Sequence, residues 1–230
     1  MAPKRWKQAL KFLVQVVALC LPAVHASSET VEISTLTDGV DLTDTIALFE
    51  DVDGVLTINE IVELDRAGVF SPVGDGSPNF GFTRSAWWVR VSVSNSSDAS
   101  AKALLRQDYP LIDRLDLWQQ SESGEWLQVS TGDQTVFSSR DIQHRDFVFR
   151  VEVPARNSRQ VYLRFSSSGP INIGLSISDE ATLISRIGRE QLGYGIYFGG
   201  FLVLLFYNLF IFIAVRDRAF FHYLLYLASY

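Results

Sequence analysis

The sequence contains very little sulfur and little histidine. Cysteine occurs once in 230 residues, at Cys20, and histidine three times. We expect Cys20 to be removed with an N-terminal signal segment, so the remaining chain cannot form a disulfide bond. His144 is the only histidine between residues 27 and 190, and a zinc site or serine triad there would depend on it alone. No nucleophile motif accompanies it, and we expect no catalytic residue in this chain.

The N-terminal segment has the pattern of a secretory signal peptide. Basic residues in the first eleven positions precede the ten-residue apolar run Phe12 to Leu21, which is too short to span a bilayer. Val24-His25-Ala26 ends the segment with small residues typical of a cleavage site. We predict that residues 1–26 are a signal peptide cut after Ala26, with an uncleaved anchor as the alternative.

Acidic residues outnumber basic ones, at 26 Asp and Glu against 20 Lys and Arg. Removal of residues 1–26 takes away four basic residues and no acidic one, which leaves a net charge of −10. Such a chain gains no electrostatic attraction from a polyanion, so we expect no nucleic-acid partner. The acidic balance is compatible with cations or neutral ligands.

Residues 27–180 lack long helical patterns and internal repeats. Short β-branched and aromatic runs are separated there by Gly, Ser, Asn, Asp and Pro. In the run 86–94, Val89, Val91 and Val93 share one face, which we assign to the core. Loops too short for crossover helices favour antiparallel pairing. We therefore predict an all-β antiparallel sandwich of about eight strands, with one short helix opened by a Thr57–Glu60 capping box.

The C-terminal part contains a 25-residue run without charge, Gln191 to Val215. As a helix it would be roughly 37 Å long, more than the ~30 Å hydrocarbon core of a bilayer, so we predict a transmembrane helix at 191–215. Residues 181–190 are predicted to form a juxtamembrane helix that runs into it without a flexible loop. Residues 219–230 resemble the first half of a second transmembrane helix, so we expect the chain to be a fragment of a longer protein.

Four sequence blocks, followed by the membrane segment, carry a family resemblance. The blocks are GFTRSAWWVRVSVSN, LLRQDYPLIDRLDLWQ, TGDQTVFSSRDIQHRDFVFRVEVP and QVYLRFSSSGPINIGLSI. In this order they resemble the second type of extracellular domain of bacterial seven-transmembrane receptors with diverse intracellular signalling modules. The run GYGIYFGGFLVLLFYNLFIFIAVRDRAFFHYLLYLASY is similar to the opening of that family's seven-helix region. Together the two matches cover nearly all of residues 30–230.

This resemblance implies a jelly-roll-like sandwich related to carbohydrate-binding modules, then seven helices and a cytoplasmic output such as a diguanylate cyclase or histidine kinase. We expect a bacterial inner-membrane receptor whose periplasmic domain binds a carbohydrate or other small ligand and shifts the first helix. Its further partners would be other helices of the same receptor or a second copy. Two alternatives stay open: a membrane-tethered carbohydrate-binding or adhesive module, and a periplasmic glycan hydrolase that uses two carboxylates.

Trp88 and Arg90 are the first candidate ligand-binding residues, because both lie on the face opposite the valines. An exposed Trp stacks on sugar rings, and Arg donates hydrogen bonds to hydroxyls or carboxylates. The alternative is that Trp88 is buried and Arg90 pairs with Asp113 or Asp133. The block from 132 to 145 could line a site or brace one, and its candidates are Asp133, Arg140, His144 and Arg145.

Asp51, Asp53 and Glu60 form a candidate calcium site, although we expect no cofactor. They fall at positions three, five and twelve of an EF-hand loop, but Phe49 occupies position one, where a carboxylate is needed. The alternative is an Asp-Gly turn before a capped helix.

Within the predicted span, Gly195 and Gly199 have the spacing of a small-xxx-small helix-packing motif. Asn208 places an amide deep in the membrane, where we expect it to bond to another helix. Helix packing is the simpler interpretation, and relay of a signal is the alternative.

Overall fold

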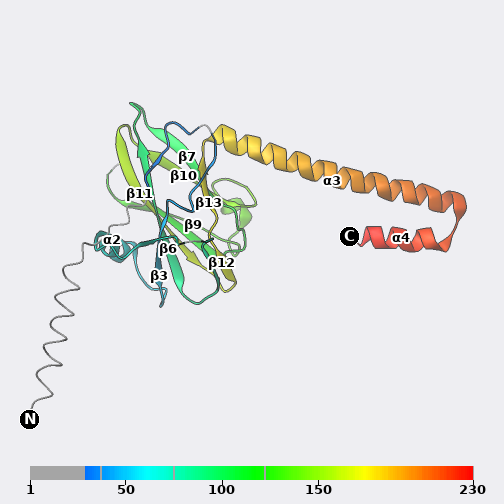
Figure 1. Cartoon of the computed structure of the whole chain (residues 1–230), viewed down its shortest axis with the longest axis horizontal. Coiled ribbons are helices and arrows are strands. Elements are labelled where there is room, and N and C mark those ends of the chain that lie inside the picture. Colours follow the sequence, from blue (N-terminus) through cyan, green and yellow to red (C-terminus); the bar gives the residue numbers. More distant parts are fainter. Residues whose placement is uncertain (1–28, 37, 75, 122, 230) are drawn as a thin grey trace, which may run out of the picture.

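The protein is described by a computed structural model that covers residues 29–36, 38–74, 76–121 and 123–229 (Figure 1). A β-sandwich forms one end of the molecule, and a long helix extends from it. The predicted signal peptide, residues 1–26, lies outside the described residues.

The larger sheet contains seven strands. Six of them follow the order β4-β3-β6-β11-β8-β9 with antiparallel pairing, and β1 pairs with β6 in parallel. Their bounds are Val31–Glu32 (β1), Ala47–Asp51 (β3), Ser71–Pro72 (β4), Ala86–Asn95 (β6), Arg114–Gln120 (β8), Trp126–Thr131 (β9) and Asn157–Ser166 (β11).

The smaller sheet has the antiparallel order β10-β7-β13-β2, and a separate pair is formed by β12 and β5. Along the chain from β6 to β13, the connections cross repeatedly from one sheet to the other, which is a jelly-roll-like arrangement. The bounds are Val40–Asp41 (β2), Asn79–Phe82 (β5), Ala101–Gln107 (β7), Phe147–Val153 (β10), Pro170–Asn172 (β12) and Leu175–Ser178 (β13), with the 3-10 turn η1 at Phe137–Ser139.

The predicted all-β sandwich followed by a long apolar helix is confirmed, but it has thirteen described strands where about eight were expected, and β1, β2 and β4 are only two residues long. Strand β1 is only two residues long because Ser34 turns back and donates both its N–H and its hydroxyl to the Glu32 carboxylate. The segment 71–81, rich in Gly, Ser and Pro, contains β4 and part of β5. These short segments are held by cross-strand bonds that a local pattern does not reveal.

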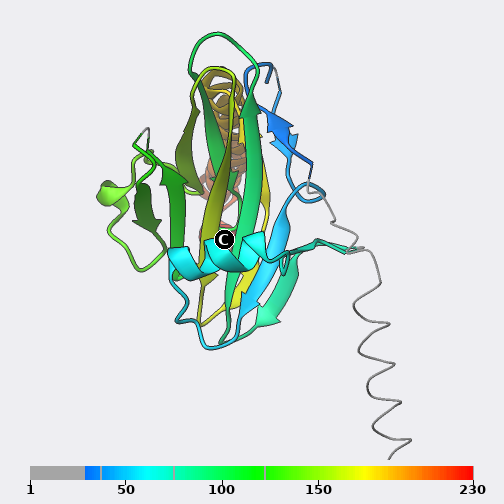
Figure 2. The ribbon, with the colours of Figure 1, turned by 90° about the vertical axis from the view of Figure 1, so that its left-hand side faces the viewer.

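The core lies between the two sheets, as the valine alternation predicted. Val89, Val91 and Val93 are buried there, together with Phe147, Phe165 and other apolar side chains of both sheets. The opposite face of β6 is also covered, because helix α2, Ile58–Arg66, packs over it with Ile61 against Trp88 and its neighbours. In Figure 2 this helix crosses in front of the larger sheet.

Helix α2 starts where the capping-box pattern predicted. The Glu60 carboxylate accepts hydrogen bonds from the backbone N–H of Thr57 at 2.8 Å and from its hydroxyl at 2.7 Å. Gly68, with φ of 74°, follows the end of the helix in a conformation that favours glycine.

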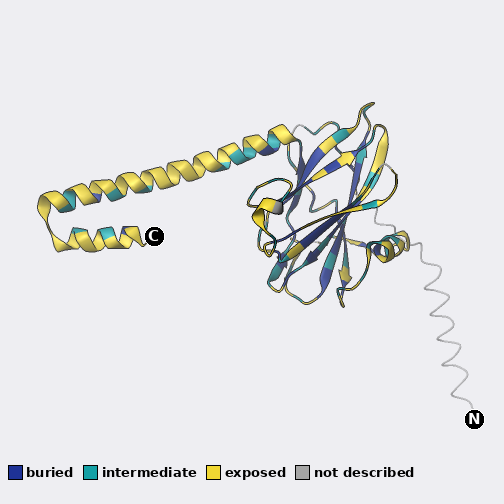
Figure 3. Cartoon of the chain, turned by 180° about the vertical axis from the view of Figure 1, so that it is seen from behind, coloured by how far each residue is buried: buried dark blue, intermediate teal, exposed yellow. Residues whose placement is uncertain are grey.

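Helix α3 is continuous from Glu180 to Val215, so the predicted juxtamembrane and transmembrane segments form one rod about 54 Å long. It is the one described helix long and apolar enough to cross a membrane, and an 18-residue stretch of it has a mean hydropathy of 2.4. After Arg216, which has φ of 58°, helix α4 (Arg218–Ala228) turns back along α3, with Phe212 and Phe221 in ring contact. Figure 3 shows that both helices are exposed along most of their length.

Candidate functional site at the junction of sandwich and helix

The loop between β9 and β10 contains four of the predicted site residues, and the structure brings three of these together, Arg140, His144 and Arg145. Arg140 lies against two rings, with its guanidinium carbon 5.0 Å from the centroid of Phe137 and 4.7 Å from that of Phe147. It also donates to the backbone oxygens of His144 at 2.7 Å and Arg145 at 3.2 Å. Arg140 therefore braces the loop, which is one of the two roles that the sequence left open.

His144 orients Asp146, which lies two residues further along the loop. Its Nδ1 accepts a hydrogen bond from the backbone N–H of Asp146 at 3.1 Å. Burial lowers the pKa of His144, which outweighs the opposite effect of Asp146, so the imidazole is neutral at neutral pH and able to accept this bond.

Asp146 and Arg106 form the buried centre of the junction. Nε and Nη2 of Arg106, on β7, lie 2.6 and 2.5 Å from Oδ2 of Asp146, and both residues are buried. Nη2 of Arg106 also lies 3.5 Å from Oε1 of Glu190 on α3. The guanidinium therefore joins a strand, a loop and the long helix.

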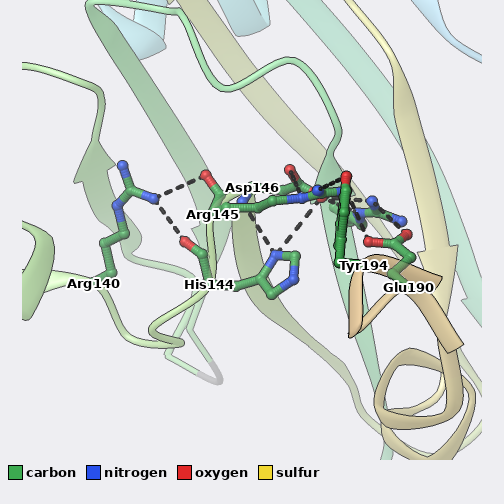
Figure 4. Close-up of polar contacts among 7 residues, drawn as sticks. Arg140, His144, Arg145, Asp146, Glu190 and Tyr194 are labelled. Atoms are coloured by element: carbon green, nitrogen blue, oxygen red, sulfur yellow. Dashed lines mark hydrogen bonds and ion pairs between the residues drawn. The ribbon is translucent and has the colours of Figure 1, made fainter. Parts of the chain in front are cut away.

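Arg145 forms a second connection to the same helix (Figure 4). It donates to Oε2 of Glu190 at 2.7 Å and to the Tyr194 hydroxyl at 2.8 Å, and its Nε lies 3.4 Å from Oδ1 of Asp146. Glu190 therefore forms ion pairs with one arginine of the sheet, Arg106, and one of the loop, Arg145. We call Arg106, His144, Arg145, Asp146, Glu190 and Tyr194 the junction network.

Apolar contacts fix the first turns of α3 beside this network. Leu183 is buried against Leu104 of β7 and Val148 of β10, and Ile142 and Ile187 complete the cluster. The register pairs Val148 with Arg106, so the apolar and charged contacts lie on the same outer face of the smaller sheet. The helix begins directly after β13, where Oδ1 of Asp179 accepts the N–H of Thr182 at 3.0 Å. No flexible linker separates the sheet from α3.

Two further candidate ligand residues, Trp88 and Arg90, lie in the cluster under α2, apart from the junction network. Trp88 is completely buried, so the predicted stacking of a sugar ring on it is wrong, and the alternative of a buried Trp88 holds. Arg90 forms an ion pair with Asp65 of α2, where the sequence had suggested Asp113 or Asp133. Helix α2 covers this face of the larger sheet, so the aromatic side chains of the face are buried in a second hydrophobic core. Asp133 is exposed at the start of the β9–β10 loop.

The three residues of the candidate calcium site do not converge. Asp51 accepts hydrogen bonds from the backbone N–H groups of Gly54 and Leu56, and Glu60 caps α2. Within the described residues, no group of three potential metal ligands is present. The alternative of an Asp-Gly turn before a capped helix describes this segment correctly.

Asn208 is buried, but its amide donates to the Leu204 oxygen of its own helix at 2.8 Å, whereas we expected a bond to another helix. The face with Gly195 and Gly199 is open, because no atom lies within 4 Å of a Cβ built at either position. Its role in helix packing stays a prediction.

Four members of the junction network were not predicted: Arg106, Asp146, Glu190 and Tyr194. Arg106 had a usable signal, since it stands inside the apolar run LLRQ, and a charge in a buried strand requires a partner. Glu190 is the last charged residue before the uncharged run. Only the folded chain shows that these two residues meet.

A surface groove of about 440 Å³ lies elsewhere, at the β3–β4 edge. Phe49, Glu50, Phe80 and Trp87 contribute to its lining, and the rings of Phe80 and Trp87 are stacked with centroids 3.5 Å apart. The indole nitrogen of Trp87 is buried and has no hydrogen-bond partner among the described residues. Aromatic rings and a carboxylate give this groove groups that can contact a small polar ligand.

Comparisons with known proteins give two family matches. The model described as 7TMR-DISM extracellular 2 matches residues 43–179, and the model described as 7TM diverse intracellular signalling matches residues 190–230. Among solved structures, CsCBM6-3 from Clostridium stercorarium in complex with cellobiose is 13% identical, and the match covers 66% of this chain and 98% of that chain with a TM-score of 0.27. This similarity is too low to support an inference about ligands. No curated protein matches the chain.

Proposed function

This chain belongs to the family of seven-transmembrane receptors with diverse intracellular signalling modules, and on that premise we propose that it senses a ligand outside the cytoplasm of a bacterium. It is a membrane protein with an external domain. In this proposal the sandwich lies in the periplasm, α3 enters the inner membrane, and a cytoplasmic module such as a diguanylate cyclase or histidine kinase provides the output.

The observation that supports signal transfer best is the direct connection between sandwich and helix. Helix α3 starts one residue after β13 and is held by an apolar cluster and by the junction network. A change in the position of β7 or of the β9–β10 loop would move the partners of Glu190 and therefore favour another position of α3. Ligand binding shifts such an equilibrium only as far as its affinity differs between the two positions.

The proposed ligand is a carbohydrate or another small polar molecule that binds in the groove at the β3–β4 edge. The exposed sides of the aromatic rings would contact apolar faces of the ligand, and Glu50 would accept hydrogen bonds from its hydroxyl groups. This groove replaces the predicted position at Trp88, which has no exposed surface.

Cysteine labelling tests the proposal in the chain reconstituted in lipid nanodiscs. Ile187→Cys places a thiol at the half-buried edge of the contact with the sheet, and Ile184→Cys is a control on the exposed side of the same helix. We expect saturating amounts of a bound sugar, found by calorimetry with neutral mono- and oligosaccharides, to change the maleimide labelling rate at residue 187 and not at 184.

Two results would contradict the proposal in different ways. Absence of binding by every sugar, or binding unaffected by Phe80→Ala, would refute the ligand class or the groove. Binding that leaves labelling at residue 187 unchanged would favour a membrane-tethered carbohydrate-binding module without signalling.

A further inference from the structure

The outer edges of the two sheets differ in how well they are protected against pairing with another strand. Proteins protect such edges with short strands, proline or charge. Strand β4 is two residues long and contains Pro72, β2 is two residues long and contains Asp41, and β10 carries exposed Arg150 and Glu152. Strand β9, Trp126–Thr131, has six residues and contains neither charge nor proline. Among the four outer edges of the two sheets, β9 is the unprotected one.

Apolar side chains are exposed along this edge. Val129 pairs with the buried Leu117 and therefore points to the core side of the sheet, yet it is 37% exposed, and Leu127 is 50% exposed. Val136 and Phe137, in the loop that follows, are exposed as well. The smaller sheet does not cover this side of β9.

The register shows which backbone groups of β9 point outward. Ser121 N–H donates to the Glu125 oxygen at 2.8 Å, which is the first bonded pair of the β8–β9 ladder. Bonded and non-bonded pairs alternate in an antiparallel ladder, and this register has no irregularity. Residues 127, 129 and 131 therefore bond to β8. The backbone groups of Trp126, Gln128 and Ser130 point away from the sheet.

We propose that β9 of a second copy of this chain pairs with β9 in antiparallel orientation, centred on Gln128. Gln128 then lies opposite Gln128 of the second copy, and Trp126 lies opposite Ser130, so the outward backbone groups bond to one another. Leu127 of each copy lies opposite Val129 of the other on the core side, which covers both apolar side chains. In this register all three outward residues of one strand lie opposite the three outward residues of the other.

The orientation of α3 favours a second copy as the partner. Antiparallel pairing of two identical edges creates a two-fold axis perpendicular to the sheet. Figure 2 looks along α3 and shows the strands of the larger sheet side by side across the view, with α3 behind them. The axis therefore runs in the general direction of α3, and both copies send their helices toward the same side. Two chains anchored in one membrane require this arrangement.

Cross-linking of the chain in nanodiscs that hold two copies tests the pairing. Gln128→Cys in a Cys20→Ser background puts the thiols of the two copies opposite each other, and Gln160→Cys, exposed on the inner strand β11, is the matched control. With a short bismaleimide we expect a covalent dimer at residue 128 to form roughly tenfold faster or more than at residue 160, because pairing raises the local concentration.

A charge on the edge gives the second test. We expect Val129→Lys to convert the detergent-solubilised dimer to monomer in native mass spectrometry, whereas Val55→Lys, which changes another exposed valine, leaves the dimer intact. Circular dichroism of both variants verifies that the sandwich remains folded. A monomeric native chain, a dimer that persists in Val129→Lys, or equal cross-linking at residues 128 and 160 would overturn the proposal.

Discussion

The carboxylate of Asp146 is buried, and the positive charge of Arg106 compensates its negative charge. Replacing Asp146 by asparagine removes the closest counter-charge of the buried guanidinium and leaves only the Glu190 carboxylate, 3.5 Å away. We expect Asp146→Asn to lower the free energy of unfolding by about 3–5 kcal/mol, measured by urea denaturation of the chain in detergent. Asp141→Asn is the control, because Asp141 pairs with Arg150 in an exposed ion pair that contributes about 1 kcal/mol or less. Similar losses in both variants would contradict the assigned role of Asp146.

Glu32 ties the two-residue strand β1 to the neighbouring segments. Hydrogen bonds, above all from the Ser34 hydroxyl and also from Ser96 and Ser94, lower the pKa of Glu32 from 4.5 to about 2. A lowered carboxyl pKa stabilises the folded state fully above pH 4.5, and this stabilisation is lost as the pH falls toward 2. We expect Glu32→Gln to reduce thermal stability at pH 7 and to flatten its decline between pH 4.5 and 2. A pH profile as steep as that of the exposed control Glu29→Gln would refute this prediction.

At the scale of elements, α3 has two different halves. Its first turns are held by the sheet, and the remainder is exposed over most of its length in the described structure. Leu183 is the buried contact of the first half, so Leu183→Ala removes apolar burial and leaves a cavity at a cost of about 2–4 kcal/mol. We expect faster hydrogen exchange in residues 180–190, with the exchange of β6 unchanged. Ile184→Ala, on the exposed side, should leave both rates as they are.

The predicted elements with the strongest local signals match the structure. Helix α2 has its capping box and β6 its valine alternation, because both patterns reflect contacts within a few residues. Trp88 shows the limit of such patterns. The sequence places it opposite the valines but does not show whether water or α2 covers that face. The contact is not local, because Ile61 of α2 lies almost thirty residues before Trp88 in the sequence.

At the scale of the whole molecule, sandwich and helix are expected to move as one body. A Gly-Gly-Ser insertion between Ser178 and Asp179 would separate the first turn of α3 from β13 and weaken the geometry of the junction network. We predict that sugar affinity stays within about twofold, since the groove lies at another edge, while the ligand-dependent change in labelling at residue 187 is lost.

The same insertion after Ser97, in the exposed turn between β6 and β7, is the control and should preserve both binding and the labelling change. Coupling that survives the insertion at residue 178 would mean that the signal does not depend on the direct connection of β13 to α3.

The sequence by itself determined the membrane-spanning character of α3, the valine core and the order of the domains, because each follows from composition or from a period of a few residues. The tertiary structure alone decided which charges meet. Arg106, Asp146 and Glu190 are separated by forty or more residues from one neighbour to the next, and they come together only when β7 pairs with β10 and α3 crosses that face. Long-range pairing leaves no local periodicity in a sequence, and so these contacts could be found only in the folded protein.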